Sequence, residues 1–178
     1  AELFWKNGYS ATGISEILKQ TGLPKGSFYF YFKSKDDLAA AVTEYYQKIL
    51  LEQFQSSSQG NDWESFIEEI FDYLFGRATG QTFAGCPYAV MGMETALSNP
   101  TLASVFMERL KKFEQIFQKV LLYSGLPQDH AAIFSRRMLS NYQGYLLLGR
   151  ISGDISYLKN AKKNMIEMYR EYRSYHGI

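Results

Sequence analysis

Four lysines near the start of the chain could neutralise phosphate groups. No aspartate or glutamate occurs between Glu16 and Asp36, so this stretch has a local charge of +4 in a protein whose net charge is +1. Gly26 would let the backbone approach another molecule closely, and nearby serine and tyrosine hydroxyls are further partners for phosphate. The stretch predicts contact with nucleic-acid phosphates, and a solvated lysine face on an ordinary helical bundle is the alternative. The lysines are Lys19, Lys25, Lys33 and Lys35.

The single cysteine, Cys86, could carry thiol chemistry. Pro87 follows it, and proline is favoured in the first turn of a helix, so Cys86 is predicted at or next to the N-cap. The helix dipole would stabilise the reactive thiolate form there. Gly80 and Gly85 in the preceding loop would leave the sulfur accessible. The alternative is a small buried hydrophobic side chain, which is the usual role of a lone cysteine.

The residues of common catalytic and metal sites are missing. The chain has two histidines and one cysteine, and it contains no phosphate-binding loop, dinucleotide-binding glycine motif or serine-nucleophile motif. A single cysteine forms neither an intrachain disulfide nor a multi-cysteine metal site. We therefore expect no enzyme activity, no cofactor and no metal.

The composition is that of a soluble globular chain. Of 178 residues, 46% are hydrophobic, 21% are charged and 16% are aromatic. No apolar run approaches the ~20 residues that a membrane span needs, so we expect a cytoplasmic protein with no membrane partner. The many aromatic residues suggest a cavity or a large interface, although a core could absorb them. The chain opens in apolar helical spacing without Met, and we expect further residues before Ala1.

Almost every segment has helical spacing, and glycine, proline and serine residues separate the segments. Short segments at the N-terminus contrast with longer ones afterwards, which predicts a compact N-terminal module on a larger helical body. The predicted helical segments are 1–7, 12–20, 24–32, 35–55, 62–77, 87–97, 100–123, 128–151 and 154–175.

The segments 12–20 and 24–32 have the layout of a helix-turn-helix, in which a short turn containing glycine joins two crossed helices. Thr21-Gly22-Leu23 would form the turn. Apolar residues recur at helical spacing and would face a common core, whereas the aromatic run 28–32 could alternatively be a strand. The residues expected to face the core are Ile14, Ile17, Leu18, Leu23, Phe28 and Phe32.

The stretch from Phe4 to Leu38 resembles the DNA-binding domain of TetR/AcrR-family transcriptional regulators. The resemblance rests on Phe4-x-x-x-Gly8-x-x-x-Thr12-x-Ile14-x-x-Ile17 and on Gly22-Leu23-Pro24-Lys25-Gly26-Ser27-Phe28-Tyr29-Phe30-Tyr31-Phe32-Lys33-Ser34-Lys35-Asp36-Asp37-Leu38. It implies an all-α fold with a helix-turn-helix DNA-binding domain over 1–34, a connecting helix over 35–55 and a ligand-binding and dimerisation domain over 56–178.

The same resemblance implies a transcriptional regulator, usually a repressor, that binds palindromic double-stranded operator DNA as a homodimer. A small-molecule or electrophilic inducer would release it. The alternative is a helical ligand-binding protein without DNA binding.

The resemblance also implies a set of DNA contacts. Thr12 would open the supporting helix and contact a phosphate, and Lys35 would hold a phosphate from the start of the long helix. Phe30 stands where a second tyrosine is usual and Tyr31 where histidine is usual. Phe30 cannot donate a hydrogen bond but could touch a thymine methyl group. The major-groove residues would be Lys25, Gly26 and Ser27, with Tyr29 and Tyr31 reaching backbone or base edges.

The stretch from Ala84 to Glu94 resembles the helix led by Gly-Cys in NemR-like members of the family, a branch associated with reactive electrophiles. The resemblance implies a sensing role for Cys86, and Glu94 could orient a ligand or simply lie at the surface. Arg150 stands where the matched pattern has lysine, and arginine is a poor nucleophile toward an oxidised sulfur. The candidate ligand or sensor residues are Cys86, Tyr88, Met91, Glu94, Phe113, Tyr142, Tyr145 and Arg150.

The last two predicted helices have the features of an interface. Apolar residues nearly encircle 128–151, which requires burial on two sides. The segment 154–175 carries one apolar stripe, which includes Leu158, Met165 and Tyr169, with lysines outside it. Four-helix packing between two copies would bury both, so the sequence predicts a homodimer.

Overall fold

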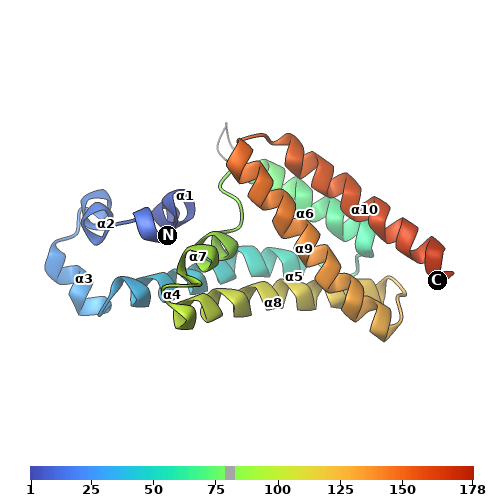
Figure 1. Ribbon diagram of the computed structural model, residues 1–178, viewed down its shortest axis with the longest axis horizontal. Coiled ribbons are helices and arrows are strands. Elements are labelled where there is room, and N and C mark those ends of the chain that lie inside the picture. The colour runs from blue at the N-terminus through green and yellow to red at the C-terminus, as the bar shows by residue number, and fades with distance from the viewer. Residues whose placement is uncertain (79–82) are drawn as a thin grey trace. The chain divides into compact units, whose positions relative to one another are not determined.

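The computed structural model describes residues 1–78 and 83–178, and every regular element in these two ranges is helical (Figure 1). The predicted all-α class is confirmed. The aromatic run 28–32 is helical rather than extended through Tyr31. In chain order the elements are α1 (Glu2–Ala11), α2 (Ile14–Thr21), α3 (Lys25–Tyr31), α4 (Lys35–Tyr46), η1 (Gln47–Leu51), α5 (Glu52–Ser57), α6 (Trp63–Arg77), α7 (Pro87–Thr95), α8 (Pro100–Tyr123), α9 (Gln128–Ser152) and α10 (Ser156–His176).

Helix starts follow the capping signals of the sequence. Asp62 caps α6 by accepting a hydrogen bond from the Ser65 N–H at 2.9 Å, and Ser34 caps α4 by accepting one from Asp37 at 3.1 Å. Proline is the first residue of both α7 and α8. These positions are favourable because a cap satisfies an otherwise unpaired N–H, and proline has no N–H to leave unpaired.

The described chain divides into two compact units. Unit 1 contains Ala1–Ile49 and Cys86–Leu110, and unit 2 contains Leu50–Gly85 and Lys111–Ile178. This division follows packing alone. The functional division at residues 34 and 55 therefore stays a prediction.

Unit 1 contains the predicted helix-turn-helix. Gly22 ends α2 in the left-handed conformation, with φ of 68°, and this allows the chain to turn within three residues before α3. Pro24 is the N-cap of α3 and Phe28 and Phe32 pack with ring centroids 5.9 Å apart. The expected turn and aromatic pair are both present.

The helix α1 is kinked at Gly8. Its backbone there has φ of 84° and ψ of 177°, a region that is essentially restricted to glycine. The predicted break at residues 7 and 8 is therefore real, but a further helical turn follows and α1 ends at Ala11. The rest of unit 1 packs around buried side chains of α1, α4, α7 and α8, including Phe4, Ala39, Tyr88, Met91 and Phe106.

The predicted single helix over 35–55 is a run of three consecutive segments, α4, η1 and α5, that ends at Ser57. The middle segment, η1, is a wider π-helical turn. Periodicity alone does not distinguish such an insertion from an α-helix over five residues.

Unit 2 is an antiparallel helical bundle, in which α9 and α10 lie side by side and α6 packs against α10 (Figure 1). Trp63 is fully buried at its centre. Its indole N–H donates to the Met165 carbonyl at 3.1 Å, and its ring meets Phe117 edge-on at 5.4 Å. Many of the aromatic residues are therefore core residues of this bundle.

Candidate nucleic-acid interface

The surface of α3 and its flanks exposes basic and aromatic side chains together. Lys19, Lys25 and Lys33 are exposed, as the charge pattern predicted. Tyr29 and Tyr31 are also exposed, and Phe30 has 80% of its surface accessible. Such a large exposed aromatic side chain is costly in water, so this surface has the character of a contact face.

Gly26 lies in the first turn of α3. A Cβ added there would meet no described atom within 4 Å, so packing inside the described chain does not require glycine at this position. Ser27 is half-buried and its N–H donates to the Pro24 carbonyl at 2.9 Å. The start of α3 is therefore open to a partner.

Two expectations for α2 are wrong. The helix begins at Ile14, with Gly13 as its N-cap, so Thr12 does not open it. Thr12 is buried and its hydroxyl donates to the Gly8 carbonyl at 2.7 Å. Its side chain therefore closes the end of α1 and is not placed to reach a phosphate.

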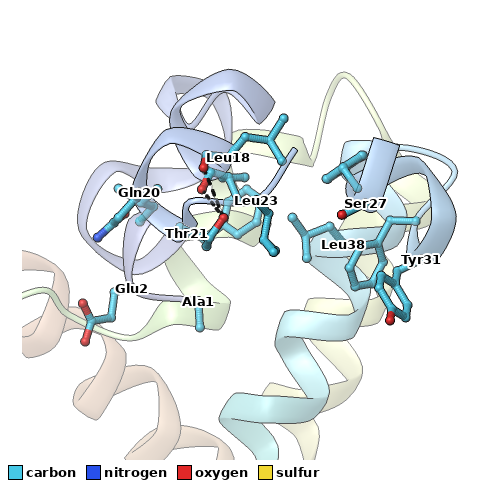
Figure 2. Close-up of a pocket in the computed structure, with 14 residues that line it drawn as sticks. Ala1, Glu2, Leu18, Gln20, Thr21, Leu23, Ser27, Tyr31 and Leu38 are labelled. Carbon is cyan, nitrogen blue, oxygen red and sulfur yellow. Dashed lines mark hydrogen bonds between the residues drawn. The ribbon is translucent and has the colours of Figure 1, made fainter. Parts of the chain in front are cut away.

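Several apolar residues of the helix-turn-helix are more exposed to solvent than their helical spacing predicted. Leu23 is 53% exposed and does not close over the turn. Ile17 and Leu18 are only half-buried because they line a groove of about 470 Å³ between α1, α2, α3 and the start of α4. Figure 2 shows Leu18, Leu23 and Leu38 around this groove, with Ser27 and Tyr31 on its α3 side.

Lys35 is half-buried and makes contacts inside unit 1. Its ammonium lies 4.3 Å from the centre of the Tyr9 ring, and it donates to the Ser10 carbonyl at 3.4 Å. Burial lowers the pKa of Lys35 from its ordinary value, while the negative charges of Glu94 and Asp36 oppose that shift. The predicted phosphate-binding lysine is thus also a structural residue.

Asp36, beside Lys35 in α4, connects α1 with the segment that precedes α8. It accepts hydrogen bonds from the Tyr9 hydroxyl and from Asn99 Nδ2, the latter at 2.7 Å. Burial, and then the hydrogen bond to Asp36, raise the pKa of Tyr9 to about 12, so this hydroxyl keeps its proton at neutral pH. Sequence reasoning missed this cluster because its members are 27 and 63 residues apart along the chain.

Cys86 is the N-cap of α7, as predicted, but its side chain is only 8% exposed. Gly80, which was expected to open access to the sulfur, lies outside the described residues. Gly85 has a positive φ of 70°, and a Cβ there would lie 3.3 Å from Arg150 Cδ. The predicted accessibility of the thiol is therefore not found in the described part of the loop.

Three further candidates lie on α7 in unit 1. Tyr88 and Met91 are fully buried, and the Tyr88 hydroxyl lies 3.5 Å from the Thr43 carbonyl. Burial raises the pKa of Tyr88. Glu94 is half-buried, and its carboxylate accepts a hydrogen bond from the Ser10 N–H at 2.7 Å. Glu94 therefore binds protein backbone in α1.

The remaining candidates lie in unit 2. Phe113 and Tyr142 are both buried and both contact Phe54, with ring centroids 4.7 Å and 6.1 Å away. Tyr145 is half-buried, as is Arg150, whose guanidinium donates to the Ala84 carbonyl. The structure thus brings Phe113 and Tyr142 together.

The helix α9 is apolar on two faces. One face is buried within unit 2, and the other exposes large apolar side chains, with Ile151 at 72%. The apolar stripe of α10 was expected to lie in an interface between two copies. Instead, its members Leu158, Met165 and Tyr169 are already buried inside the single chain. The large apolar side chains exposed on α9 are those of Ile133, Leu147, Leu148 and Ile151, and the exposed residues between them include Arg136, Arg137, Ser140 and Gly144.

Neither a metal-binding cluster nor a membrane-spanning helix occurs in the part of the chain that the structure describes. Within residues 1–78 and 83–178, no three histidine, cysteine or acidic side chains are grouped so that they could hold a metal ion. None of the helices described combines the length and hydropathy of a membrane span.

Two family profiles match the chain. Residues 1–42 match the profile of bacterial regulatory proteins of the tetR family. Residues 64–164 match the C-terminal domain of LmrA/YxaF-like transcriptional regulators.

Individual transcriptional regulators are also similar to this chain, in sequence or in fold. The HTH-type transcriptional regulator YxaF of Bacillus subtilis is 30% identical over 161 residues, which cover 86% of this chain and 82% of YxaF. The HTH-type transcriptional repressor NemR of Escherichia coli is 38% identical over 90 residues, which cover 48% of this chain and 44% of NemR. A TetR transcriptional regulator from Legionella pneumophila has the same fold, with a TM-score of 0.82 at 18% identity over 94% of this chain and 91% of that one.

Proposed function

The chain belongs to the TetR family of bacterial regulatory proteins, and we propose on that basis that it is a repressor that a small molecule releases from operator DNA. It is a helix-turn-helix transcriptional regulator. The observation that best supports operator binding is the exposed surface of α3 and its flanks, where lysine, tyrosine and phenylalanine side chains gather without an acidic residue between Glu16 and Asp36. Its place of action would be the bacterial cytoplasm, where the DNA is.

The proposed contacts divide by chemistry. Lys25, Gly26 and Ser27 would enter the major groove at the start of α3, and Tyr29 and Tyr31 would reach backbone or base edges. Lys35 would reach a phosphate from the first turn of α4, in addition to its contact with Ser10. Thr12 is left out because it is buried.

The exposed face of α9 supports a homodimer. It presents large apolar side chains beside two small residues, which allow helices to approach closely. A second copy of the chain, related by a two-fold axis, would bury this face on both molecules at once.

Selection of duplexes from a random DNA library with the purified protein tests operator binding and dimerisation together. We expect the selected duplexes to contain two inverted half-sites with centres separated by about one helical turn, or a multiple of it, because a two-fold dimer presents two copies of α3. Light scattering should give an even number of chains per duplex. If no duplex is enriched over the starting library, the protein is a helical ligand-binding protein without DNA binding.

The double variant Leu147→Glu/Ile151→Glu supplies the matched test of the interface. Two carboxylates per chain on an apolar contact should dissociate the dimer, because an unpaired charge is costly to bury. We expect the variant to be a folded monomer with weakened binding to the selected duplex. Lys159→Glu and Lys163→Glu on the exposed polar side of α10 should leave the dimer intact. A double variant that remains dimeric would place the interface elsewhere.

The inducer would be a small molecule held among the aromatic side chains of the helical body, with Tyr145 and Arg150 as its half-buried polar contacts. Because Cys86 is only 8% exposed, we expect it to react with N-ethylmaleimide at least about tenfold more slowly than free cysteine. Mass spectrometry of the intact native protein, with the urea-unfolded protein as the control, measures this rate.

The variant Cys86→Ser decides whether that thiol has a sensing role. We expect it to bind the selected duplex as the unmodified protein does. Rapid modification of native Cys86, accompanied by DNA release that Cys86→Ser abolishes, would contradict the packing role. It would make Cys86 the sensor of an electrophilic inducer.

A further inference from the structure

Glu94 connects α7 to the end of α1, the helix that leads into the helix-turn-helix. The residue lies near the end of α7, and its carboxylate accepts a hydrogen bond from the Ser10 N–H, 84 residues away in the chain, at 2.7 Å. Ser10 follows the kink at Gly8 and precedes α2 by only a few residues. The hydrogen bond therefore holds the segment of chain from which the helix-turn-helix begins.

The backbone N–H and the backbone C=O of Ser10 are both held by side chains. While Glu94 accepts from its N–H, the Lys35 ammonium donates to its carbonyl at 3.4 Å. The Glu94 carboxylate and the Lys35 ammonium also attract each other electrostatically. One acidic side chain of α7 and one basic side chain of α4 thus hold the N–H and the C=O of the same residue of α1, which belong to consecutive peptide bonds.

The absence of a side chain at Gly8 leaves room for the Glu94 carboxylate. A Cβ at Gly8 would overlap Glu94 Oε1 and lie 2.7 Å from Glu94 Cδ. The positive φ of 84° at Gly8 also breaks the helical hydrogen-bond pattern, so the N–H groups that follow need other acceptors. Backbone conformation and steric space at Gly8 therefore both favour the Glu94 contact.

We propose that Glu94 is a positioning residue through which α7 holds the helix-turn-helix in its DNA-binding arrangement. The proposal rests on the proposed DNA-binding function and adds to it a residue that touches no DNA. Glu94 acts by fixing the Ser10 N–H and by orienting Lys35. A preorganised helix-turn-helix binds DNA more tightly because less conformational freedom is lost on binding.

The test compares Glu94→Ala and Glu94→Gln with Glu108→Ala, which removes an exposed carboxylate from α8 in the same unit. Hydrogen exchange of residues 8–12 is measured on the full chain without DNA, and affinity for the selected duplex is measured at several salt concentrations. Glu94→Ala should speed exchange at Ser10 and weaken DNA binding about tenfold, because a hydrogen bond to a charged group is lost. The slope of affinity against salt should not change, because no phosphate contact is lost.

Glu94→Gln should retain most of the affinity, because its carbonyl oxygen still accepts from the Ser10 N–H. This rescue separates positioning from a general loss of stability. Gly8→Ala offers a second approach, since its methyl group displaces the carboxylate. It should weaken DNA binding in the wild type by a larger factor than in the Glu94→Ala background.

Two results would overturn the proposal. One is that Glu94→Ala matches Glu108→Ala in both exchange and affinity. The other is that Glu94→Ala and Glu94→Gln lose affinity equally along with a lower melting temperature, which indicates a role in folding only. A wild-type protein that selects no duplex would instead overturn the proposed function, so the two failures are distinguishable.

Discussion

The triple variant Lys25→Ala/Tyr29→Ala/Tyr31→Ala should lose operator binding by about a thousandfold while remaining folded. Each of the three side chains is exposed on α3, so its removal creates no cavity. Direct contacts to bases are each worth about 1–3 kcal/mol, and three losses of that size multiply in affinity. Fluorescence anisotropy with the selected duplex measures the loss, and circular dichroism checks the fold.

The matched control is Lys119→Ala/Tyr123→Ala/Tyr175→Ala, which removes the same three side-chain types from exposed positions in unit 2. We expect it to bind the duplex as the wild type does. Lys35→Ala separately distinguishes the two roles of that residue. Loss of a phosphate contact reduces the slope of log affinity against log salt concentration by about one unit. If Lys35 only positions other residues, its removal weakens DNA binding and leaves that slope unchanged. Unaltered binding by the α3 triple variant would place the DNA site on another surface.

Local signals in the sequence located most helix ends correctly. Asp62, Pro87 and Pro100 mark starts, and Gly22 marks the end of α2, because each acts on the backbone within one turn of itself. Such effects depend on few neighbours and can be inferred without the fold. The exposure of Lys25, Tyr29 and Tyr31 could also be inferred, because Phe28 faces the core from the opposite side of this short helix.

Features that depend on distant residues could not be inferred in this way. Thr12 was expected at a helix start, but its hydroxyl closes the kink that Gly8 creates. An apolar stripe indicates which side of α2 faces inward, yet not that a groove lies beneath it. Glu94 was expected to orient a ligand or to lie at the surface. Its partner, Ser10, is 84 residues away, and no spacing in the sequence connects the two.

Replacing Trp63 by alanine should lower the free energy of unfolding by about 3–5 kcal/mol, the largest effect on stability that we expect from a single substitution. Trp63 is fully buried, and its ring contacts those of Phe66, Phe117 and Tyr169 at centroid distances of 5.9, 5.4 and 6.2 Å. Removing it leaves a cavity among side chains of its own helix and of two other helices of unit 2, α8 and α10. It also removes the hydrogen bond from its indole N–H to the Met165 carbonyl.

Urea unfolding followed by far-ultraviolet circular dichroism is the appropriate measurement, at one fixed protein concentration because the proposed dimerisation would add to the apparent stability. Tryptophan fluorescence is unsuitable, since the chain has only two tryptophans and the substitution removes one of them. Tyr123→Ala, which removes an exposed aromatic side chain from α8, is the control and should change stability by less than about 0.5 kcal/mol.

The variant Trp63→Phe separates packing from hydrogen bonding at this site. Phenylalanine keeps part of the ring volume but cannot donate to the Met165 carbonyl, so its cost should lie between those of the wild type and Trp63→Ala. Because the indole joins α6 to α10, both variants should destabilise unit 2 as a whole, and hydrogen exchange should accelerate across both helices together. Acceleration confined to α6 would mean that Trp63 stabilises its own helix and does not connect the bundle.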